Sequence, residues 1–252
     1  MMRALILAAG RGSRLGELTK DKPKCLMQLA GKSLIEWQLN AFSGAGIHDV
    51  AVVRGYKAEL LEFTKVKFFE NRKWETTNMV SSLLCATEWT RKENCIISYA
   101  DIVYPKETVI SLSQSNDDIC ISYNVDWWDV WKLRFENPLD DAETFRVDEN
   151  GLVTEIGGKT KNIDDIKGQY MGLLKFTPTG WNQIEEFLLS LRAEEVAKLD
   201  MTLLLSRLIK KGVEIKGIPI EGMWYEVDNE TDLNTYTSII ARGKSWMNAL
   251  IK

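Results

Sequence analysis

The stretch "LAAGRGSRL" at residues 7–15 decides how the fold of this 252-residue chain is interpreted. It begins inside an apolar run at residues 4–9 and continues directly into Gly10, Gly12 and two arginines. A short apolar run that ends at glycine predicts a buried strand, and ligands of open α/β sheets bind at the carboxyl ends of such strands. Glycine lets backbone N–H groups approach phosphate oxygens, and arginine binds phosphate through paired donors. The stretch therefore predicts a phosphate-binding loop after the first strand.

The spacing of this loop excludes the two commonest nucleotide-binding motifs. The Walker A pattern G-x-x-x-x-G-K-[ST] does not occur in the sequence. The dinucleotide fingerprint G-x-G-x-x-G requires a third glycine where this chain has Leu15, and the next glycine, Gly16, comes one position late. Other residues must therefore define what the loop binds.

The composition is that of an ordinary soluble globular protein, with 45% apolar and 27% charged residues. A net charge of −4 argues against a broad nucleic-acid-binding face, and no apolar run approaches the ~20 residues of a membrane helix. The four cysteines form no C-x-x-C pair and the chain has one histidine, so neither a zinc site nor histidine base catalysis is expected. We expect a cytoplasmic protein with no nucleic-acid or membrane partner.

Hydrophobic patterning predicts an α/β fold in which strands and helices alternate. Helices are expected at residues 34–46, with Ser33 as the cap, and at 55–63, 77–89, 181–191, 200–212 and 230–242. Strands are expected at residues 3–9, 50–54, 66–71, 95–99, 119–125, 169–176, 213–220 and 223–229. Alternation at these lengths favours right-handed βαβ units and a mainly parallel sheet.

A second segment, "KPKCLMQLAGKSLIEWQLNAF" at residues 22–42, completes a family resemblance. Together with the loop, it resembles the nucleotidyltransferases that join a nucleoside triphosphate to a phosphorylated small molecule and release pyrophosphate. The resemblance implies a Rossmann-like α/β/α sandwich with a mainly parallel central sheet and a smaller inserted substrate-binding part. It implies a single domain over residues 1–252, with a nucleotide-binding core at 1–125 and acceptor binding and a second metal ligand at 126–252.

The same resemblance implies which residues carry the chemistry. Arg14 and Lys24 would contact the phosphates and act in catalysis with Asp101, which ends a predicted strand. Asp101 and Asp228 would hold Mg²⁺, an ion that prefers carboxylate, phosphate and water oxygens. The expected nucleotide-binding set is Leu7, Ala8, Ala9, Gly10, Arg11, Gly12, Ser13, Tyr56, Asn78, Ser82 and Ala100.

The segment "TTNMVSSL" at residues 76–83 favours CTP as the nucleotide. It resembles a segment of bacterial LicC-like choline-phosphate cytidylyltransferases, and the chain lacks the "G-T-A" element more frequent in sugar nucleotidyltransferases. The stretch "NPLDDAETF" at residues 137–145 resembles cytidylyltransferases of bacterial capsule or surface-polysaccharide clusters that act on phosphorylated amino-acid-type acceptors.

The acceptor stays open among phosphocholine, phosphoglutamine and an aminoalkyl phosphonate. Acidic and aromatic side chains in the second half suit a cationic headgroup. Whether Trp127, Trp128 and Trp131 line the pocket or pack the core is also open. The expected acceptor-binding residues are Asp141, Glu143, Tyr170, Gly172, Trp224 and Glu226.

Two other functions compete with a Mg²⁺-dependent cytidylyltransferase that would be a monomer or a homodimer. One is a sugar-1-phosphate nucleotidyltransferase that makes a nucleotide sugar. The other is a non-catalytic nucleotide-sensing module. Such a module would be expected to lack Lys24, Asp101 or Asp228, and all three are present.

Overall fold

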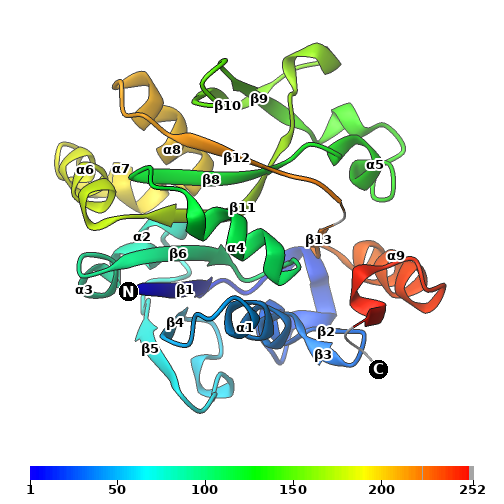
Figure 1. Cartoon of the computed structure of the whole chain (residues 1–252). Coiled ribbons are helices and arrows are strands. Elements are labelled where there is room, and N and C mark those ends of the chain that lie inside the picture. The colour runs from blue at the N-terminus through cyan, green and yellow to red at the C-terminus, as the bar shows by residue number, and fades with distance from the viewer. Residues whose placement is uncertain (223, 250–252) are drawn as a thin grey trace.

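A seven-stranded sheet forms the centre of the computed structural model, which describes residues 1–222 and 224–249 (Figure 1). Within these residues, β11 runs antiparallel to its neighbours β6 and β8, and the other neighbouring strands are parallel. The predicted α/β fold with a mainly parallel sheet is therefore confirmed. The strand order is β12 (Lys216–Ile220), β8 (Ile119–Asn124), β11 (Gln169–Phe176), β6 (Asn94–Tyr99), β1 (Met2–Ala8), β4 (Val50–Arg54) and β5 (Val66–Glu70).

The sheet is covered on both faces because its strands are apolar on both sides. In β1, Leu5 and Leu7 point into one core, and Ala4 and Ile6 point into the other. The first core includes residues of α2 (Met79–Leu84), α3 (Thr87–Thr90), α6 (Pro178–Leu189) and α8 (Met201–Lys210). The second includes residues of α1 (Leu34–Gly44), α4 (Lys106–Gln114) and α5 (Trp127–Trp131), and Figure 1 shows α1 and α4 in front of the strands.

The predicted helix after residue 33 is confirmed together with its cap. The Ser33 side chain accepts a hydrogen bond from the Glu36 backbone, and the Glu36 carboxylate accepts one from Ser33 N at 2.7 Å. This capping box satisfies two N–H groups at the start of the helix. The helix ends at Gly44, two residues before Gly46, which has a φ of 79°.

Two other helix predictions are wrong in extent. The expected helix at residues 55–63 is a single 3₁₀ turn, η3 (Ala58–Leu60), which follows Lys57 in the left-handed conformation. The expected helix at residues 77–89 is divided into α2 and α3, because Ala86 between them has a non-helical φ of −109° and ψ of 22°. Apolar spacing cannot reveal such a local backbone change.

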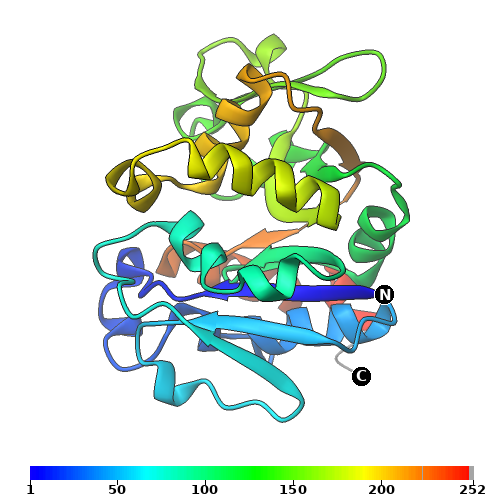
Figure 2. The same ribbon diagram turned by 90° about the vertical axis from the view of Figure 1, so that its left-hand side faces the viewer.

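The chain between β8 and β11 forms the inserted part. It contains α5, the 3₁₀ turn η4 (Pro138–Asp140) and an antiparallel hairpin of β9 (Glu143–Val147) and β10 (Val153–Lys159). The hairpin lies at the top in Figures 1 and 2, above the strands of the N-terminal half. Because β11 and β12 belong to the same sheet as β1, the second half of the chain extends the first half rather than packing beside it.

A two-stranded ribbon links the end of the first half to the end of the chain. It pairs β7 (Ile102–Val103) with β13 (Tyr225–Glu226), just before α9 (Glu230–Ala241). The strand expected at 223–229 is thus shorter, and its first residue, Met223, lies outside the described residues. No helix in the described ranges has the length and apolar character needed to cross a membrane.

Candidate active site

The loop after β1 is shaped by its contact with Lys24. Gly12 has a φ of 74°, and its carbonyl accepts hydrogen bonds from Leu15 N at 3.0 Å and from the Thr19 hydroxyl at 3.1 Å. A Cβ at Gly12 would lie 2.7 Å from Cβ and 2.8 Å from Cδ of Lys24. Glycine is therefore required here for two reasons, a left-handed backbone and a close approach to the lysine stem.

Lys24 bridges two carboxylates that are far apart in the sequence. Its Nζ donates to Asp101 Oδ2 at 2.8 Å and to Asp228 Oδ1 at 2.9 Å. The β7–β13 ribbon brings the two acids together, because β7 begins directly after Asp101 and β13 ends two residues before Asp228. Val227 N also donates a hydrogen bond to Asp101 O at 2.9 Å. The three residues assigned from sequence thus form one cluster at the carboxyl ends of β1 and β6.

The charges in this cluster stabilise one another. Burial acts to lower the pKa of Lys24, but the carboxylates of Asp101 and Asp228 outweigh it and the pKa lies above the ordinary value. Burial acts to raise the pKa of Asp228, whereas Lys24, Arg14 and Arg134 together hold that pKa below the ordinary value. The lysine is therefore an ammonium and Asp228 a carboxylate at neutral pH.

The two loop arginines have different partners. Arg14 Nη2 lies 2.9 Å from Asp228 Oδ1, and its side chain is 71% exposed and faces open space. Arg11 instead stacks on Tyr56, with 5.8 Å from its guanidinium carbon to the ring centre. The Tyr56 hydroxyl donates to the carbonyl of Lys20, which holds the ring against the loop.

A first pocket of about 280 Å³ opens beside this cluster. Cys25, Met79 and Tyr99 complete its wall. Of the residues predicted to bind nucleotide or phosphate, the wall contains Leu7, Ala8, Gly10, Gly12, Ser13, Arg14, Lys24, Ala100, Asp101 and Asp228. We call this cavity the nucleotide pocket.

Five residues of the expected nucleotide set lie outside the wall of that pocket. Ala9 is buried and its carbonyl accepts a hydrogen bond from Tyr56 N at 2.9 Å, so its backbone fixes the start of the loop. Asn78 caps α2, with its side chain accepting from Met79 N at 2.8 Å. The Ser82 hydroxyl is buried and accepts from Asn71 Nδ2 at 3.0 Å. Arg11 and Tyr56 form the stacked pair described above.

A second pocket of about 220 Å³ lies on the side of the inserted hairpin. We call it the acceptor pocket. The expected residues Asp141, Glu143, Tyr170, Gly172 and Glu226 line it. Gly172 has a φ of 75°, and a Cβ there would lie 2.7 Å from the Tyr99 ring, so glycine leaves room for that ring.

The tryptophans divide between the pocket and the core. Trp224 is 2% exposed and packs against Trp131, with ring centres 6.1 Å apart, so its side chain belongs to the core rather than to the acceptor pocket. Trp131 lines the acceptor pocket, and its indole N–H donates to Asp141 Oδ2 at 3.1 Å. Trp127 is buried, and Trp128 packs against its edge at 5.4 Å.

The acceptor pocket is acidic with cations at its border. Burial raises the pKa of Glu143, while Lys159 on the neighbouring strand acts to lower it. Burial raises the pKa of Glu226 to about 7, Asp228 adds to the rise and Arg134 opposes it. The Lys159 ammonium lines the same pocket and donates to the carbonyl of Asp141 at 3.4 Å.

The two pockets share Arg14, Tyr99 and Asp228. A ligand in one pocket and a ligand in the other would therefore meet beside Arg14 and Asp228. This arrangement suits a group transfer between two bound molecules more than the binding of one.

The carboxylates of the cluster also fit a hard cation. Asp101 Oδ1 is buried and has no hydrogen-bond partner, although a buried carboxylate oxygen normally has one. Asp101 and Asp228 supply the two carboxylates with which Mg²⁺ commonly combines phosphate and water ligands. Across residues 1–222 and 224–249, no group of three or more Cys, His, Asp and Glu side chains is arranged to hold a metal by itself.

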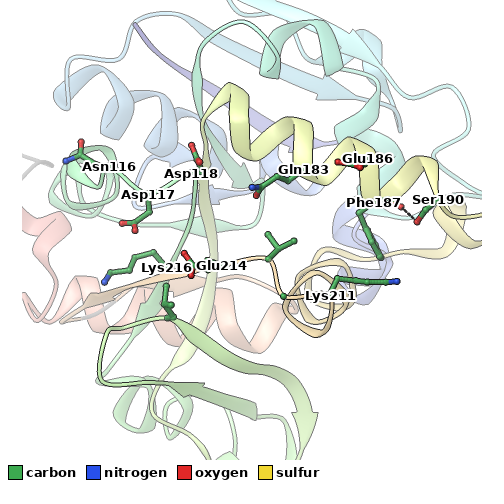
Figure 3. A pocket seen from close by; sticks show the side chains of 13 residues that line it. Asn116, Asp117, Asp118, Gln183, Glu186, Phe187, Ser190, Lys211, Glu214 and Lys216 are labelled. Atoms are coloured by element: carbon green, nitrogen blue, oxygen red, sulfur yellow. Dashed lines mark hydrogen bonds between the residues drawn. The ribbon is translucent and has the colours of Figure 1, made fainter.

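A cavity of about 790 Å³, larger than either of these pockets, lies elsewhere (Figure 3). Its lining includes residues 116–118 before β8 and Glu214 before β12, so it opens at the amino ends of these strands. Figure 3 shows its acidic and basic side chains spread around the rim. None of its described lining side chains has a buried polar atom without a hydrogen-bond partner. Size alone does not make it the reactive site.

Sequence reasoning missed Arg134 and Lys159. Arg134 pairs with three carboxylates, but the sequence around it has no regular apolar spacing that would indicate this role. Lys159 is one of many lysines in the chain. Their importance follows from the pairing of β9 with β10 and from the bond between Arg134, which follows α5, and Asp232 of α9, which no local pattern encodes.

The fold and the site together are typical of a nucleotidyltransferase. A Rossmann-like sheet carries a glycine-rich loop, a lysine between two aspartates and two adjoining pockets. Residues 4–136 match the MobA-like NTP transferase domain, and the chain belongs to this family of enzymes. Within it, the chain falls among the cytidylyltransferases. It is 38% identical over 248 residues to the CTP:phosphoglutamine cytidylyltransferase of Campylobacter jejuni, covering 92% of this chain and 98% of that protein.

Solved structures show the same fold at lower identity. The CTP:phosphocholine cytidylyltransferase of Streptococcus pneumoniae superposes with a TM-score of 0.71 at 22% identity, covering 95% of this chain and 99% of that one. A putative glucose-1-phosphate thymidylyltransferase of Bacillus anthracis gives 0.74 at 16% identity, covering 95% of each chain.

Proposed function

We propose that this enzyme transfers CMP from CTP to a phosphorylated acceptor of the amino-acid type, such as phosphoglutamine, and releases pyrophosphate. The observation that carries the proposal is the meeting of the two pockets at Arg14, Tyr99 and Asp228. The likeness over nearly the whole chain to a CTP:phosphoglutamine cytidylyltransferase supports both the nucleotide and the acceptor.

The proposed reaction needs charge and position more than a protein nucleophile. An oxygen of the acceptor phosphate attacks the α-phosphorus of CTP, a new P–O bond forms, and the bond to the β-phosphate breaks as pyrophosphate leaves. Because the attacking oxygen is already an anion, no side chain has to remove its proton. The enzyme must bring two anions together, which calls for fixed cations in a partly closed site.

Lys24 and Arg14 are the cations that we assign to this task. An ammonium has three N–H donors, and Asp101 and Asp228 accept two of those of Lys24, which leaves one for a phosphate oxygen in the nucleotide pocket. Arg14 lies where the pockets join, so its exposed guanidinium can contact both phosphates. Mg²⁺, bound by Asp101 and Asp228, would supply further neutralisation of the triphosphate.

The acceptor pocket favours a ligand that carries both charges. Glu143, Glu226 and Asp141 suit an ammonium group, and Lys159 suits a carboxylate. A phosphorylated amino acid carries both groups. Phosphocholine has a cation and no anion besides its phosphate, so it would leave Lys159 without a ligand partner.

The test is a panel of acceptors with CTP, Mg²⁺ and pyrophosphate release as the readout. Phosphoglutamine, phosphocholine, 2-aminoethylphosphonate and glucose 1-phosphate are compared, and each is repeated with UTP and dTTP. We expect CTP with phosphoglutamine to give the highest kcat/KM. A preference for glucose 1-phosphate with UTP or dTTP would refute the proposal and favour a sugar nucleotidyltransferase.

A further inference from the structure

Arg134 is a buried cation that the reaction described above does not use. It lies between α5 and η4 in the inserted part, and its side chain is 1% exposed. Its Nη1 donates to Glu226 Oε2 at 2.6 Å, and its Nη2 donates to Asp228 Oδ2 at 3.0 Å. Its Nε donates to Asp232 Oδ1 at 3.1 Å. One guanidinium thus binds three carboxylates.

Asp232 fixes the orientation of this guanidinium. Asp232 belongs to the capping box of α9, and its Oδ2 accepts from Asp228 N at 2.9 Å and from Asn229 N at 3.3 Å. The Nη2 group of Arg134 also donates to Asp232 Oδ2, at 3.2 Å, so two guanidinium nitrogens bind one carboxylate in a fork. Forked pairs of this kind are directional as well as strong.

Arg134, held by Asp232, also bonds to side chains that line the two pockets. Glu226 lines the acceptor pocket, and Asp228 lines both pockets. Since Arg134 takes Oδ2 of Asp228, the other oxygen, Oδ1, is the one that faces Lys24 and Arg14. The arginine therefore determines which edge of the shared carboxylate is presented to the reacting groups.

The contacts exceed what a structural ion pair requires. Asp232 alone would neutralise Arg134, yet two further bonds go to carboxylates that line the pockets. Without the guanidinium, Glu226 and Asp228 would stand close together as two buried acids with the same charge, a costly arrangement. Lys24 and Arg14 would still hold Oδ1 of Asp228, but its Oδ2 and the Glu226 carboxylate would lose the guanidinium that orients them.

We propose that Arg134 is a positioning residue that sets Asp228 and Glu226 for CMP transfer and so links the inserted part to the reacting centre. This rests on the proposed function, because it assigns the two carboxylates to the acceptor and the transfer step. Lysine cannot replace Arg134 here, since one ammonium cannot reproduce a planar fork that serves three acids.

The experiment compares Arg134→Lys with the wild type in steady-state kinetics on CTP and phosphoglutamine. We expect a kcat about 10- to 100-fold lower, the range typical of changes to residues that orient metal-ligating side chains, the role proposed here for Asp228. We also expect the KM for phosphoglutamine to rise at least fivefold and the KM for CTP to change less, because Arg134 touches one residue of the nucleotide pocket. Arg146→Lys is the matched control, because Arg146 is a half-exposed arginine paired with Glu155 and Asp165 outside both pockets, and its kinetic constants should stay within twofold.

The acceptor KM separates positioning from stability. A smaller folded fraction lowers the apparent kcat but leaves both KM values unchanged, and that result would overturn the proposal. Kinetic constants within twofold of the wild type would overturn it as well. If Arg134→Lys does not fold, Asp232→Asn, which keeps a capping oxygen, should raise the acceptor KM in the same direction, and an unchanged KM there refutes the idea. A wild-type enzyme inactive with every acceptor refutes the proposed function instead.

Discussion

Replacing Lys24 by methionine tests the centre of the proposed mechanism. Methionine keeps most of the alkyl stem against which Gly12 packs and removes only the ammonium. Alanine would also leave a gap beneath the loop, so its effect would mix packing with charge. The Lys24 side chain is 10% exposed, so water replaces the lost charge poorly.

Two magnitudes follow from the position of this charge. Loss of one preorganised donor in a reaction site costs about 3–4 kcal/mol, or roughly a 10²- to 10³-fold decrease in kcat. Breaking a buried ion pair costs about 3–5 kcal/mol of folding free energy, and the smaller value applies because Asp101 is partly exposed. We therefore expect a measurable fall in Tm together with a decrease in kcat of roughly 10²- to 10³-fold.

The assay is pyrophosphate release at saturating CTP and phosphoglutamine, with Tm measured by circular dichroism on the same samples. Lys20→Met is the matched control, because the Lys20 side chain is exposed and its ammonium pairs with Glu17 three residues earlier. Its effect on stability should stay below about 0.5 kcal/mol and its kcat should be unchanged. A Lys24→Met enzyme that is folded and retains more than one third of the wild-type kcat would refute the reasoning.

Three further predictions concern the residues around this charge. Gly12→Ala should lower kcat at least tenfold with an intact fold by circular dichroism, because a Cβ would strike Lys24 and strain a left-handed backbone. Trp131→Phe should cost about 1–3 kcal/mol in urea unfolding and raise the acceptor KM, because the Asp141 carboxylate loses its indole donor. Wild-type stability should fall between pH 4.5 and 7 relative to Glu226→Gln. In the folded protein the pKa of Glu226 is raised to about 7, so at low pH the folded state binds a proton more tightly than the unfolded chain does. The stability gained from this proton is lost as the pH rises through 7. Parallel Tm curves for the two proteins would contradict this.

Most of the fold could be predicted because its signals are local. The apolar run of β1 and the capping box at Ser33 and Glu36 each specify an element within a few residues. The reversed direction of β11 could not be predicted, because its strand pattern is the same in either orientation. The division between α2 and α3 depends on the backbone of Ala86, although alanine has the highest helix propensity of all residues.

The site was predictable where a short motif defines it. The resemblance pointed to Lys24, Asp101 and Asp228, and the structure brings all three within hydrogen-bond distance. Their role in binding phosphate and Mg²⁺ stays a prediction. Arg134 lacked any such signal because its partners lie more than 90 residues away in the sequence, so only the folded chain reveals it.

The core and the insertion supply different residues of the two pockets, which explains how acceptor choice could change on this fold. Of the three residues shared by the pockets, Arg14 comes from the loop after β1, Tyr99 from β6 and Asp228 from the β13–α9 junction. By contrast, Trp131, Asp141, Glu143 and Lys159 of the acceptor pocket all come from the inserted part.

Exchange of that insertion would therefore alter the acceptor without moving Lys24 between its aspartates. Such an exchange works only if the insertion stays fixed to the reacting centre. Within the described residues, Arg134 contributes to that attachment through charged bonds to Glu226, Asp228 and Asp232. An insertion without an equivalent cation would leave the acceptor pocket in place but poorly aligned with the α-phosphate.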